Sequence, residues 1–400
     1  MPDGTVGHVR SITGDERRAR VAQRHRLAPS TRVDDDIVGI ARSVVVLHAT
    51  DPATVVLSAV QRMRTPDPRR VERALFEDRT LLRMLAMRRT LWTVAVEDAA
   101  VIQRSSSDAV AAAERKRFVK LLEDKGVAKD GARFLRRAEA KALAALSEAG
   151  ELAAADLSKQ VKELAIQIPV SEGKSYASTI GVGARVLFLL AAEGRVVRGR
   201  TTGGWTSSRH RWTPVDRWLG EPIAELPAED ARAALVRMWL ARFGPATVED
   251  ITWWTGWTLG HTRTALAALD VEPVDLEGTE GVVLAGDTES PPLEPFVTLL
   301  PGLDPTTMGW KHRDWYLGDH RARIFDTNGN GGPTVWVDGR IVGGWAQRKS
   351  GEVVFQLLED IGAERTAEVA ERAADLERLL DEVRVVVRFP GPLDRELARG

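Results

Sequence analysis

The same order of predicted helices and strands recurs along this chain, and this repetition restricts the possible folds more than any other feature. In residues 228–269 a helical segment, AEDARAALVRMWLARFG, precedes a short helix, a Gly-containing turn and a further helix, LGHTRTALAAL. Two strand-like stretches follow in EPVDLEGTEGVVLAG. Residues 145–213 show the same order, and residues 18–95 show it more loosely. Helix, short helix, turn, helix and β-hairpin is the order of a winged helix-turn-helix, so we expect three such units in tandem.

The composition changes at SPPLEP (290–295), after which the chain becomes strand-like. Residues 296–357 alternate apolar segments with turn sequences such as DTNGNGG and VDGR. An amphipathic helix over 363–382 and a final strand over 383–390 close the pattern. We predict a small β-barrel or curled sheet with one helix. The expected fold class is therefore α+β, with three tandem winged helix-turn-helix units followed by a C-terminal β-barrel.

These patterns divide the chain into five expected segments. They are a flexible tail (1–16), a first winged-helix unit (17–107), a second with a basic wing (108–220), a third (221–290) and a β-barrel with helix (291–400). Inside the first unit we expect a helix over 71–86 and a strand pair around 88–94.

The composition excludes several classes of site. The 400 residues include no cysteine, so disulfides, thiolate catalysis and Cys-ligated metals are impossible. Phosphate-binding GxxxxGK[ST], HExxH and GxSxG motifs are absent, and the seven His residues show no ligand spacing, so we expect no metal or organic cofactor. No apolar run reaches the roughly 18 residues that span a membrane. The start, MPDGTVGHVR, lacks the apolar core of a signal peptide. We expect a cytoplasmic, nucleoid-associated monomer.

The net charge is −1, but the charges are unevenly placed. Residues 17–26 hold five Arg and no acid, 101–145 hold 11 Lys and Arg against 6 acids, and 195–217 hold 6 Arg against one Asp. Residues 221–290, in contrast, hold 4 Arg against 13 acids. A solvated helix face would explain any one basic run. Three such runs in the first half predict a polyanionic partner.

The segment RGRTTGGWTSSRHRW has the composition of a hairpin that follows phosphates or enters a groove. Most of the 12 Trp are expected in the core, but Trp205 lies at the predicted tip, where an aromatic ring can stack on a base. The candidate DNA contacts are Arg24, Arg26, Arg198, Arg200, Trp205, Arg209 and Arg211.

A polar cluster lies in VVVLHATDPATVVLSAVQRM (44–63). Asp51 followed by Pro52 marks a helix start, with Asp at the N-cap and Pro in the first turn. The residues before it are expected to be extended, so His48 and Thr50 point to the same side. The N-cap role alone explains Asp51. Alternatively, an imidazole, a hydroxyl and a carboxylate converge at a helix N-terminus, where water or phosphate can bind.

Three stretches carry a family resemblance: DDDIVGIARSVVVLHATDPATVVLSAVQRM, FVTLLPGLDPTTMGWKHRDWYLG and GRIVGGWAQRKSGEVVFQLLED. With them, the chain resembles the AlkZ/YcaQ-type winged-helix DNA glycosylases of bacteria over residues 18–395. The resemblance implies a monofunctional DNA glycosylase that hydrolyses the N-glycosidic bond of N7-alkylated purines in double-stranded DNA. It also implies a C-shaped molecule whose open cleft accepts bulky adducts and interstrand crosslinks.

Active members of that family carry Gln-x-Gln or Gln-x-Asp before the second helix of the first unit. This chain has His48-Ala49-Thr50 there, followed by Asp51. N7-alkylation already makes the purine a good leaving group, so the enzyme must position water and stabilise an oxocarbenium-like sugar. His48 would accept a proton from water, Thr50 would orient that water, and Asp51 would offset the charge of the sugar.

Two alternatives stay open. The chain is a non-catalytic winged-helix DNA-binding protein, a damage sensor or transcriptional regulator, if His-Ala-Thr does not replace the Gln motif. It is a structural or interaction protein without DNA binding if the Arg residues of 17–26 and 195–211 do not share one face.

Overall fold

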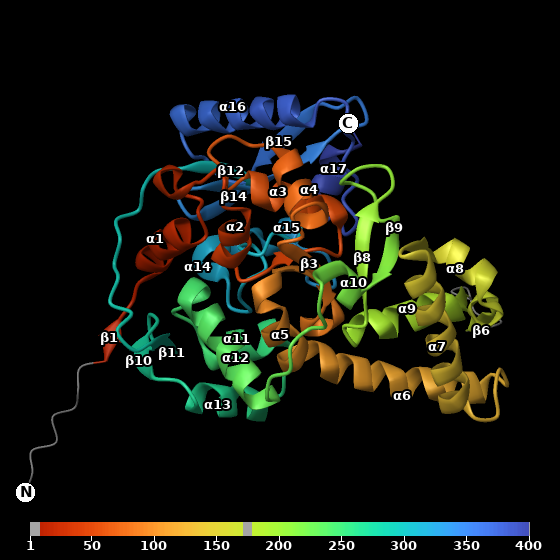
Figure 1. Cartoon of the computed structure of the whole chain (residues 1–400). Coiled ribbons are helices and arrows are strands. Elements are labelled where there is room, and N and C mark those ends of the chain that lie inside the picture. Colours follow the sequence, from red (N-terminus) through yellow and green to blue (C-terminus); the bar gives the residue numbers. More distant parts are fainter. Residues whose placement is uncertain (1–8, 171–177, 400) are drawn as a thin grey trace, which may run out of the picture. The chain divides into compact units, whose positions relative to one another are not determined.

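The computed structural model describes residues 9–170 and 178–399, and both helices and strands are numerous in it (Figure 1). The protein is therefore α+β, as predicted. Its contacts divide the chain into two compact units. Unit 1 combines Met1–Val71 with Arg232–Gly400, and unit 2 is Glu72–Ala231. The five segments expected from the sequence are finer than these units and stay a prediction. None of the described helices is long and apolar enough to cross a membrane.

The N-terminal part of unit 1 begins earlier than expected. Its elements are β1 (Arg10–Ser11), α1 (Gly14–Arg24), α2 (Ile37–Ser43), β2 (Leu47–His48), α3 (Pro52–Val60) and α4 (Pro68–Phe76), the last of which continues into unit 2. β1 pairs in parallel with β10 (Val271–Asp275), and Ile12 is fully buried in a cluster with Val274 and Val283. The expected tail over 1–16 is therefore wrong for residues 10–16. The partner of β1 lies more than 260 positions away, so the local sequence gives no sign of it.

The middle of the chain has the predicted order of helices and hairpin. The elements are α11 (Ala228–Phe243), α12 (Val248–Thr255), α13 (Leu259–Ala267), β10 and β11 (Glu280–Leu284). α12 begins with a capping box, in which Thr247 and Asp250 bind each other's backbone N–H. It ends at Gly256, whose φ of 72° favours glycine and stops the helix.

The C-terminal part of unit 1 is an open sheet. Its antiparallel strands follow the order β12 (Val297–Leu300), β13 (Thr334–Val337), β14 (Arg340–Gln347) and β15 (Val353–Leu357). α16 (Ala363–Leu380) packs along this sheet (Figure 1), and three shorter helices complete the region: α14 (Asp314–Leu317), α15 (Arg321–Ile324) and α17 (Pro392–Leu397). β12 and β15 are free edges within the described residues, so the expected closed barrel is not formed there.

The final strand expected over 383–390 is also absent. The Val385 N–H donates to Gln347 Oε1 at 2.9 Å, and Gln347 Nε2 donates to Val383 O at 3.0 Å. A side-chain amide of β14 thus takes the place of a partner strand. The Val-rich composition of this segment suggested a strand, but two hydrogen bonds with the Gln347 side chain replace strand pairing there.

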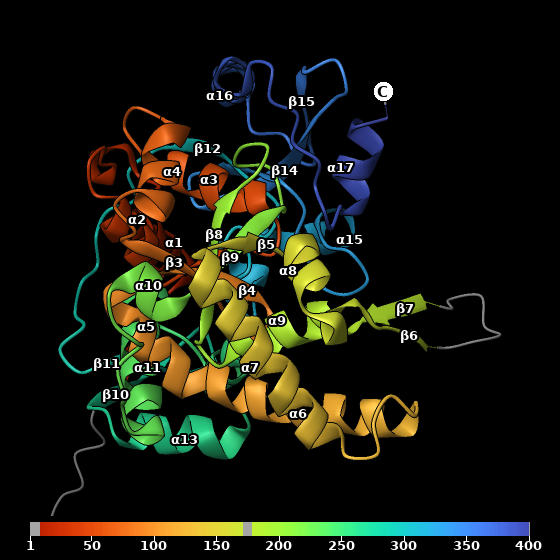
Figure 2. The same ribbon diagram turned by 45° about the vertical axis from the view of Figure 1, so that its right-hand side comes forward.

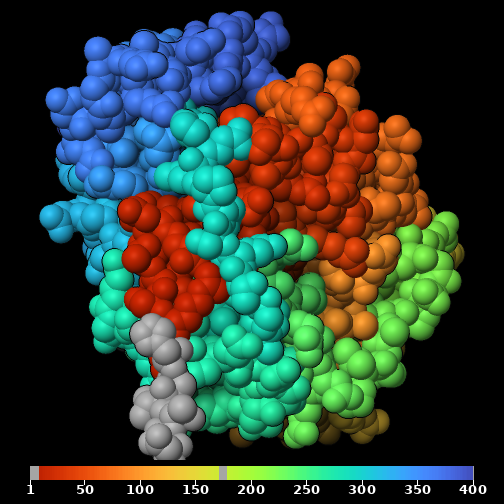
Figure 3. Space-filling model, turned by 90° about the vertical axis from the view of Figure 1, so that its left-hand side faces the viewer, coloured from red at the N-terminus to blue at the C-terminus, as the bar shows by residue number. Residues whose placement is uncertain are grey.

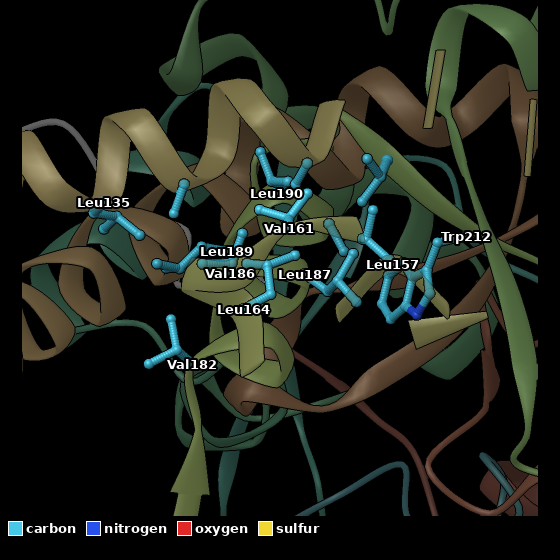
Figure 4. Close-up of a cluster of buried hydrophobic side chains, with 14 of the residues drawn as sticks. Leu135, Leu157, Val161, Leu164, Val182, Val186, Leu187, Leu189, Leu190 and Trp212 are labelled. Carbon is cyan, nitrogen blue, oxygen red and sulfur yellow. The ribbon is translucent and has the colours of Figure 1, made fainter. Parts of the chain in front are cut away.

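Unit 2 combines long helices with short strands. Its elements are β3 (Leu81–Leu85), β4 (Leu91–Ala95), α5 (Ala99–Ile102), α6 (Asp108–Asp124), α7 (Gly131–Ala149), β5 (Leu152–Ala153), α8 (Ala154–Gln160), β6 (Gln167–Val170), β7 (Ser178–Gly181), α9 (Val182–Ala192), β8 (Val196–Thr201), β9 (His210–Pro214) and α10 (Val215–Leu219). α6 packs beside α7, and β6 and β7 extend as a two-stranded ribbon (Figure 2). Leu and Val side chains from α7, α8 and α9 form its core together with Trp212 (Figure 4).

The first hairpin of unit 2 lies earlier in the chain than predicted. The helix expected over 71–86 ends at Phe76, and β3 and β4 replace the strand pair expected around 88–94. All five residues of β3 are buried, which removes the alternation that marks a strand exposed on one face. Arg79 has a φ of 53°, a conformation that ends a helical path.

A buried polar network fixes α3 within unit 1. Arg62 forms a two-point ion pair with Asp304 at 2.9 Å, and both side chains are fully buried. Inside α3, the Thr54 hydroxyl donates to Gly302 O at 2.7 Å. Residues 285–296 run as an extended segment across the N-terminal helices (Figure 3), where Ser30 N–H donates to the Glu294 carboxylate. α3 is therefore anchored at several points to segments from the other end of the chain.

Candidate functional site

The first candidate site is the start of α3. β2 ends at His48, and Thr50 leads to Asp51, whose backbone is extended at φ −100° and ψ 119°. The Ala53 N–H donates a hydrogen bond to Asp51 Oδ1 at 3.1 Å, and Pro52 occupies the first turn. The N-cap that the Asp-Pro pair predicts is therefore present.

The second carboxylate oxygen of Asp51 is bound from near the C-terminus. The Arg388 N–H donates to Asp51 Oδ2 at 3.0 Å, and Arg388 Nη1 lies 3.5 Å from Thr50 O. The Arg388 side chain is exposed. Sequence reasoning missed this residue, because 337 positions separate it from Asp51 and no local pattern marks the contact. Arg388 brings a positive charge to the helix start.

Burial controls the electrostatics of this site. Asp51 is 6% exposed and His48 is 3% exposed, while Thr50 is half-buried. Removal from water raises the pKa of Asp51 above its ordinary value of 3.8, and the N–H groups of Arg388 and Ala53 oppose that rise. The Asp51 carboxylate is a negative charge in little water, where it acts strongly on a nearby positive charge.

The backbone of Thr50 contacts the His48 ring. The Thr50 N–H donates to His48 Nδ1 at 3.4 Å, which is long for a hydrogen bond and therefore weak. A neutral imidazole that accepts at Nδ1 carries its proton on Nε2. The structure thus brings His48, Thr50 and Asp51 together at one helix start.

The second candidate site is the β8–β9 hairpin. Gly203 and Gly204 adopt φ values of 97° and 81°, the left-handed conformations that the predicted Gly-Gly turn requires. Trp205 follows them in the turn and is half-buried, and Arg209 is exposed and forms no ion pair within the described part of the chain. Arg200 keeps 57% of its side chain exposed. These three side chains are accessible to a ligand.

Two other arginines of the hairpin have different surroundings. Arg211 Nε lies 2.8 Å from the carboxylate of Glu151, so its charge is already neutralised. The Arg198 guanidinium lies over the Trp212 ring, 4.7 Å from its centroid. One strand pair therefore holds exposed, paired and packed arginines side by side.

The candidate DNA contacts on and after α1 are engaged within unit 1. Arg24 is 7% exposed at its side chain and forms ion pairs with Asp287 at 2.7 Å and with Glu289 at 3.2 Å. Arg26 pairs with Asp36 at 2.9 Å. The contacts of Arg24 fix α1 to the 285–296 segment, and that of Arg26 joins the end of α1 to the start of α2.

A metal site has no support in the residues that the structure covers. Among them, no group of three or more His, Asp or Glu side chains comes close enough to hold an ion.

Comparisons with known proteins place the chain in a family. No curated protein matches it. The solved structure of the Streptomyces sahachiroi DNA glycosylase AlkZ superposes with a TM-score of 0.72 at 21% sequence identity, covering 95% of this chain and 100% of that chain. At this identity the likeness shows a shared fold. The model of the family "DNA glycosylase AlkZ-like" matches residues 41–379. Because that match spans most of the sequence, the chain belongs to the AlkZ-like DNA glycosylases, hydrolases that act on N-glycosyl bonds.

Proposed function

We propose that this protein is a monofunctional glycosylase that releases N7-alkylated purines, bulky adducts and crosslinked bases included, from double-stranded DNA. The observation that carries the proposal is the position of Asp51, a buried N-cap carboxylate at the start of α3, with His48 and Thr50 directly before it. These residues lie where active members of the resembled family carry their Gln motif. Polar groups capable of the same chemistry thus replace that motif.

Asp51 has the leading role in this proposal. Departure of an alkylated purine leaves positive charge on the deoxyribose, and a fixed carboxylate in little water stabilises that charge. The N–H groups of Ala53 and Arg388 fix both oxygens of Asp51, so little reorganisation is needed during the reaction. The exposed guanidinium of Arg388 is suited to a phosphate next to the lesion.

His48 and Thr50 act on the attacking water. The bond from the Thr50 N–H to His48 Nδ1 is weak, so a water molecule can replace it and give a proton to that nitrogen. The half-buried Thr50 hydroxyl orients the same water.

DNA binding is proposed for the exposed part of the β8–β9 hairpin, through Arg200, Trp205 and Arg209. In this proposal the hairpin is the wing of one winged-helix unit, and α11 to α13 with β10 and β11 form another. The protein acts as a monomer without a cofactor. Arg24, Arg26 and Arg211 are assigned secondary roles, because each already pairs with a carboxylate.

One observation favours a second candidate function, a DNA-binding protein without catalysis. Both oxygens of Asp51 already accept hydrogen bonds, which is what a purely structural N-cap would show. A damage sensor with this structure would bind the lesion and leave the glycosidic bond intact.

Base release from a duplex with a single N7-methylguanine separates the two candidates. Wild type is compared with Asp51→Asn and His48→Ala, and release is read as strand cleavage after alkaline treatment. Asp36→Asn is the matched control, because Asp36 is also an N-cap carboxylate of unit 1, at the start of α2. We expect Asp51→Asn to slow release by about 10²–10³-fold and His48→Ala by about 10²-fold.

The control variant should release the base at the wild-type rate, and all variants should bind the duplex. No release by wild type, with binding retained on this duplex and on duplexes with bulkier adducts, would favour the sensor. Equal loss in Asp51→Asn and Asp36→Asn would reduce Asp51 to a structural cap.

A further inference from the structure

Strands β3 and β8 of unit 2 bring together arginines that have no acid to neutralise them. Arg83 on β3 is 9% exposed, and its Nη2 donates to Gly199 O on β8 at 3.1 Å. Arg198 is the preceding residue on β8. Neither guanidinium forms an ion pair with any residue in the described ranges, 9–170 and 178–399. Buried charges in proteins are usually paired, so this arrangement calls for an explanation.

Aromatic rings hold these cations on one patch. Arg83 and Arg200 both lie over Phe76, with guanidinium carbons 5.2 and 5.7 Å from the ring centroid. Arg198 lies close to Arg83, because the positive charge of Arg83 contributes to the lowering of the pKa of Arg198. Three guanidinium groups thus share one region. The nearest carboxylate, that of Glu77, lies 3.7 Å from Arg200 and is more than half exposed.

The pKa values of this region show the effect of positive charge that no carboxylate balances. Burial lowers the pKa of Arg83 and of Arg198 to about 10, so both stay charged at neutral pH. Burial and the charge of Arg198 lower the pKa of His210 to about 4, so its imidazole is neutral. Arg198 Nη1 is shielded from solvent and has no hydrogen-bond partner in the described structure. This N–H donor of Arg198 is therefore available to an acceptor that carries negative charge.

We propose that Arg83, Arg198 and Arg200 form a binding site for a phosphate group. Guanidinium groups bind phosphate oxygens by paired, charge-assisted hydrogen bonds, and a bound phosphate would supply the missing countercharge. The phosphate has two possible sources, a free phosphate or phosphate ester and the backbone of a DNA strand. The second source rests on the proposed function, whereas the site itself does not.

Thermal unfolding of the full chain tests the site. Wild type is measured with and without about 20 mM inorganic phosphate at matched ionic strength set by chloride. We expect phosphate to raise the Tm by about 1–3 °C. Arg198→Met should remove this rise, and it should raise the Tm in chloride, because an apolar side chain replaces an unpaired buried charge.

Arg211→Met is the matched control, because Arg211 lies in the same hairpin and pairs with Glu151. It should keep the response to phosphate. If Arg198→Met does not fold, Arg200→Ala serves instead, since its side chain is mostly exposed, and it should weaken phosphate binding about 3–10-fold. A wild-type Tm that phosphate does not change, or a response that persists in Arg198→Met, would overturn the proposal.

Binding of an undamaged fluorescent duplex then identifies the source. A loss of about tenfold in duplex affinity in Arg198→Met, with competition by inorganic phosphate in wild type, indicates a DNA phosphate. Unchanged duplex affinity together with the Tm response indicates a free phosphate or ester. Both outcomes support the site. Because neither experiment measures base release, absence of glycosylase activity would leave this inference standing.

Discussion

Two arginine-rich segments look alike in the sequence and differ in the structure. On α1, Arg20 is fully buried and bound to Asp287 at 2.9 Å, and Arg24 shares the same carboxylate at 2.7 Å. On the β8–β9 hairpin, Arg200 is mostly exposed and Arg209 is exposed. Arg20 and Arg24 of α1 hold unit 1 together, whereas Arg200 and Arg209 of the hairpin are accessible to a ligand.

The role of a basic segment therefore depends on which acidic residues reach it in the folded chain, and not on the number of its charges. The sequence around α1 contains five Arg and no acid between residues 17 and 26, yet Asp287 and Glu289 arrive from a segment more than 260 positions away. The hairpin receives fewer acids, with Glu151 bound to Arg211 and Glu77 close to Arg200. A contact with a polyanion is therefore indicated by arginines that are exposed in the structure, and not by the number of arginines in the sequence.

The largest effect on this comparison is expected from Arg20→Ala. The substitution removes a fully buried guanidinium that binds both acids and leaves Asp287 with Arg24 and Glu16 with Arg10, and we expect a loss of about 3 kcal/mol in the free energy of unfolding. Chemical denaturation measures it. Arg69→Ala is the control, since Arg69 is exposed and pairs only with Asp67 at the surface, and its unfolding should match wild type. Duplex affinity of folded Arg20→Ala should stay unchanged. A large loss of affinity without a loss of stability would contradict the structural role assigned to the α1 arginines.

A smaller effect is expected from the double variant Arg200→Ala with Arg209→Ala. Removal of two exposed charges should weaken duplex binding about 10-fold at moderate salt and lower the dependence of log affinity on log salt by about two. Fluorescence anisotropy over a salt series measures both quantities. Arg211→Ala, which removes a paired charge from the same hairpin, should change the affinity by less than about 2-fold. Equal losses of duplex affinity in Arg211→Ala and in the double variant would contradict the view that only the exposed arginines bind DNA.

Local patterns predicted those elements that local interactions make. The Asp51-Pro52 helix start, the helices α6 and α7 and the Gly-Gly turn of the β8–β9 hairpin all follow from capping, periodicity and turn chemistry. The order of helices and hairpin over 228–284 was also readable, because each step has its own signal.

Contacts between distant segments could not be predicted in this way. Arg388 reaches Asp51 through its backbone N–H, a group that every residue except proline carries, so no residue type marks it. β1 is a two-residue strand whose partner, β10, lies far along the chain. Residues 383–390 are rich in Val like a strand but are bound by the Gln347 side chain, a contact between segments that local composition does not reveal.

The most direct test of catalysis at the α3 start is the pH dependence of single-turnover base release from an N7-methylguanine duplex, corrected for spontaneous depurination. Burial raises the pKa of Asp51, and the charged form is the one proposed to stabilise the sugar. The rate is therefore constant at neutral pH and falls as the pH drops through a midpoint above 3.8, the ordinary value for Asp. The profile is measured in the His48→Ala background, so that the proposed base does not contribute to it, and the double variant His48→Ala with Asp51→Asn should be slower and show no such fall. A rate of His48→Ala with no acidic limb, or an acidic limb that persists in the double variant, would contradict a catalytic role for the Asp51 carboxylate.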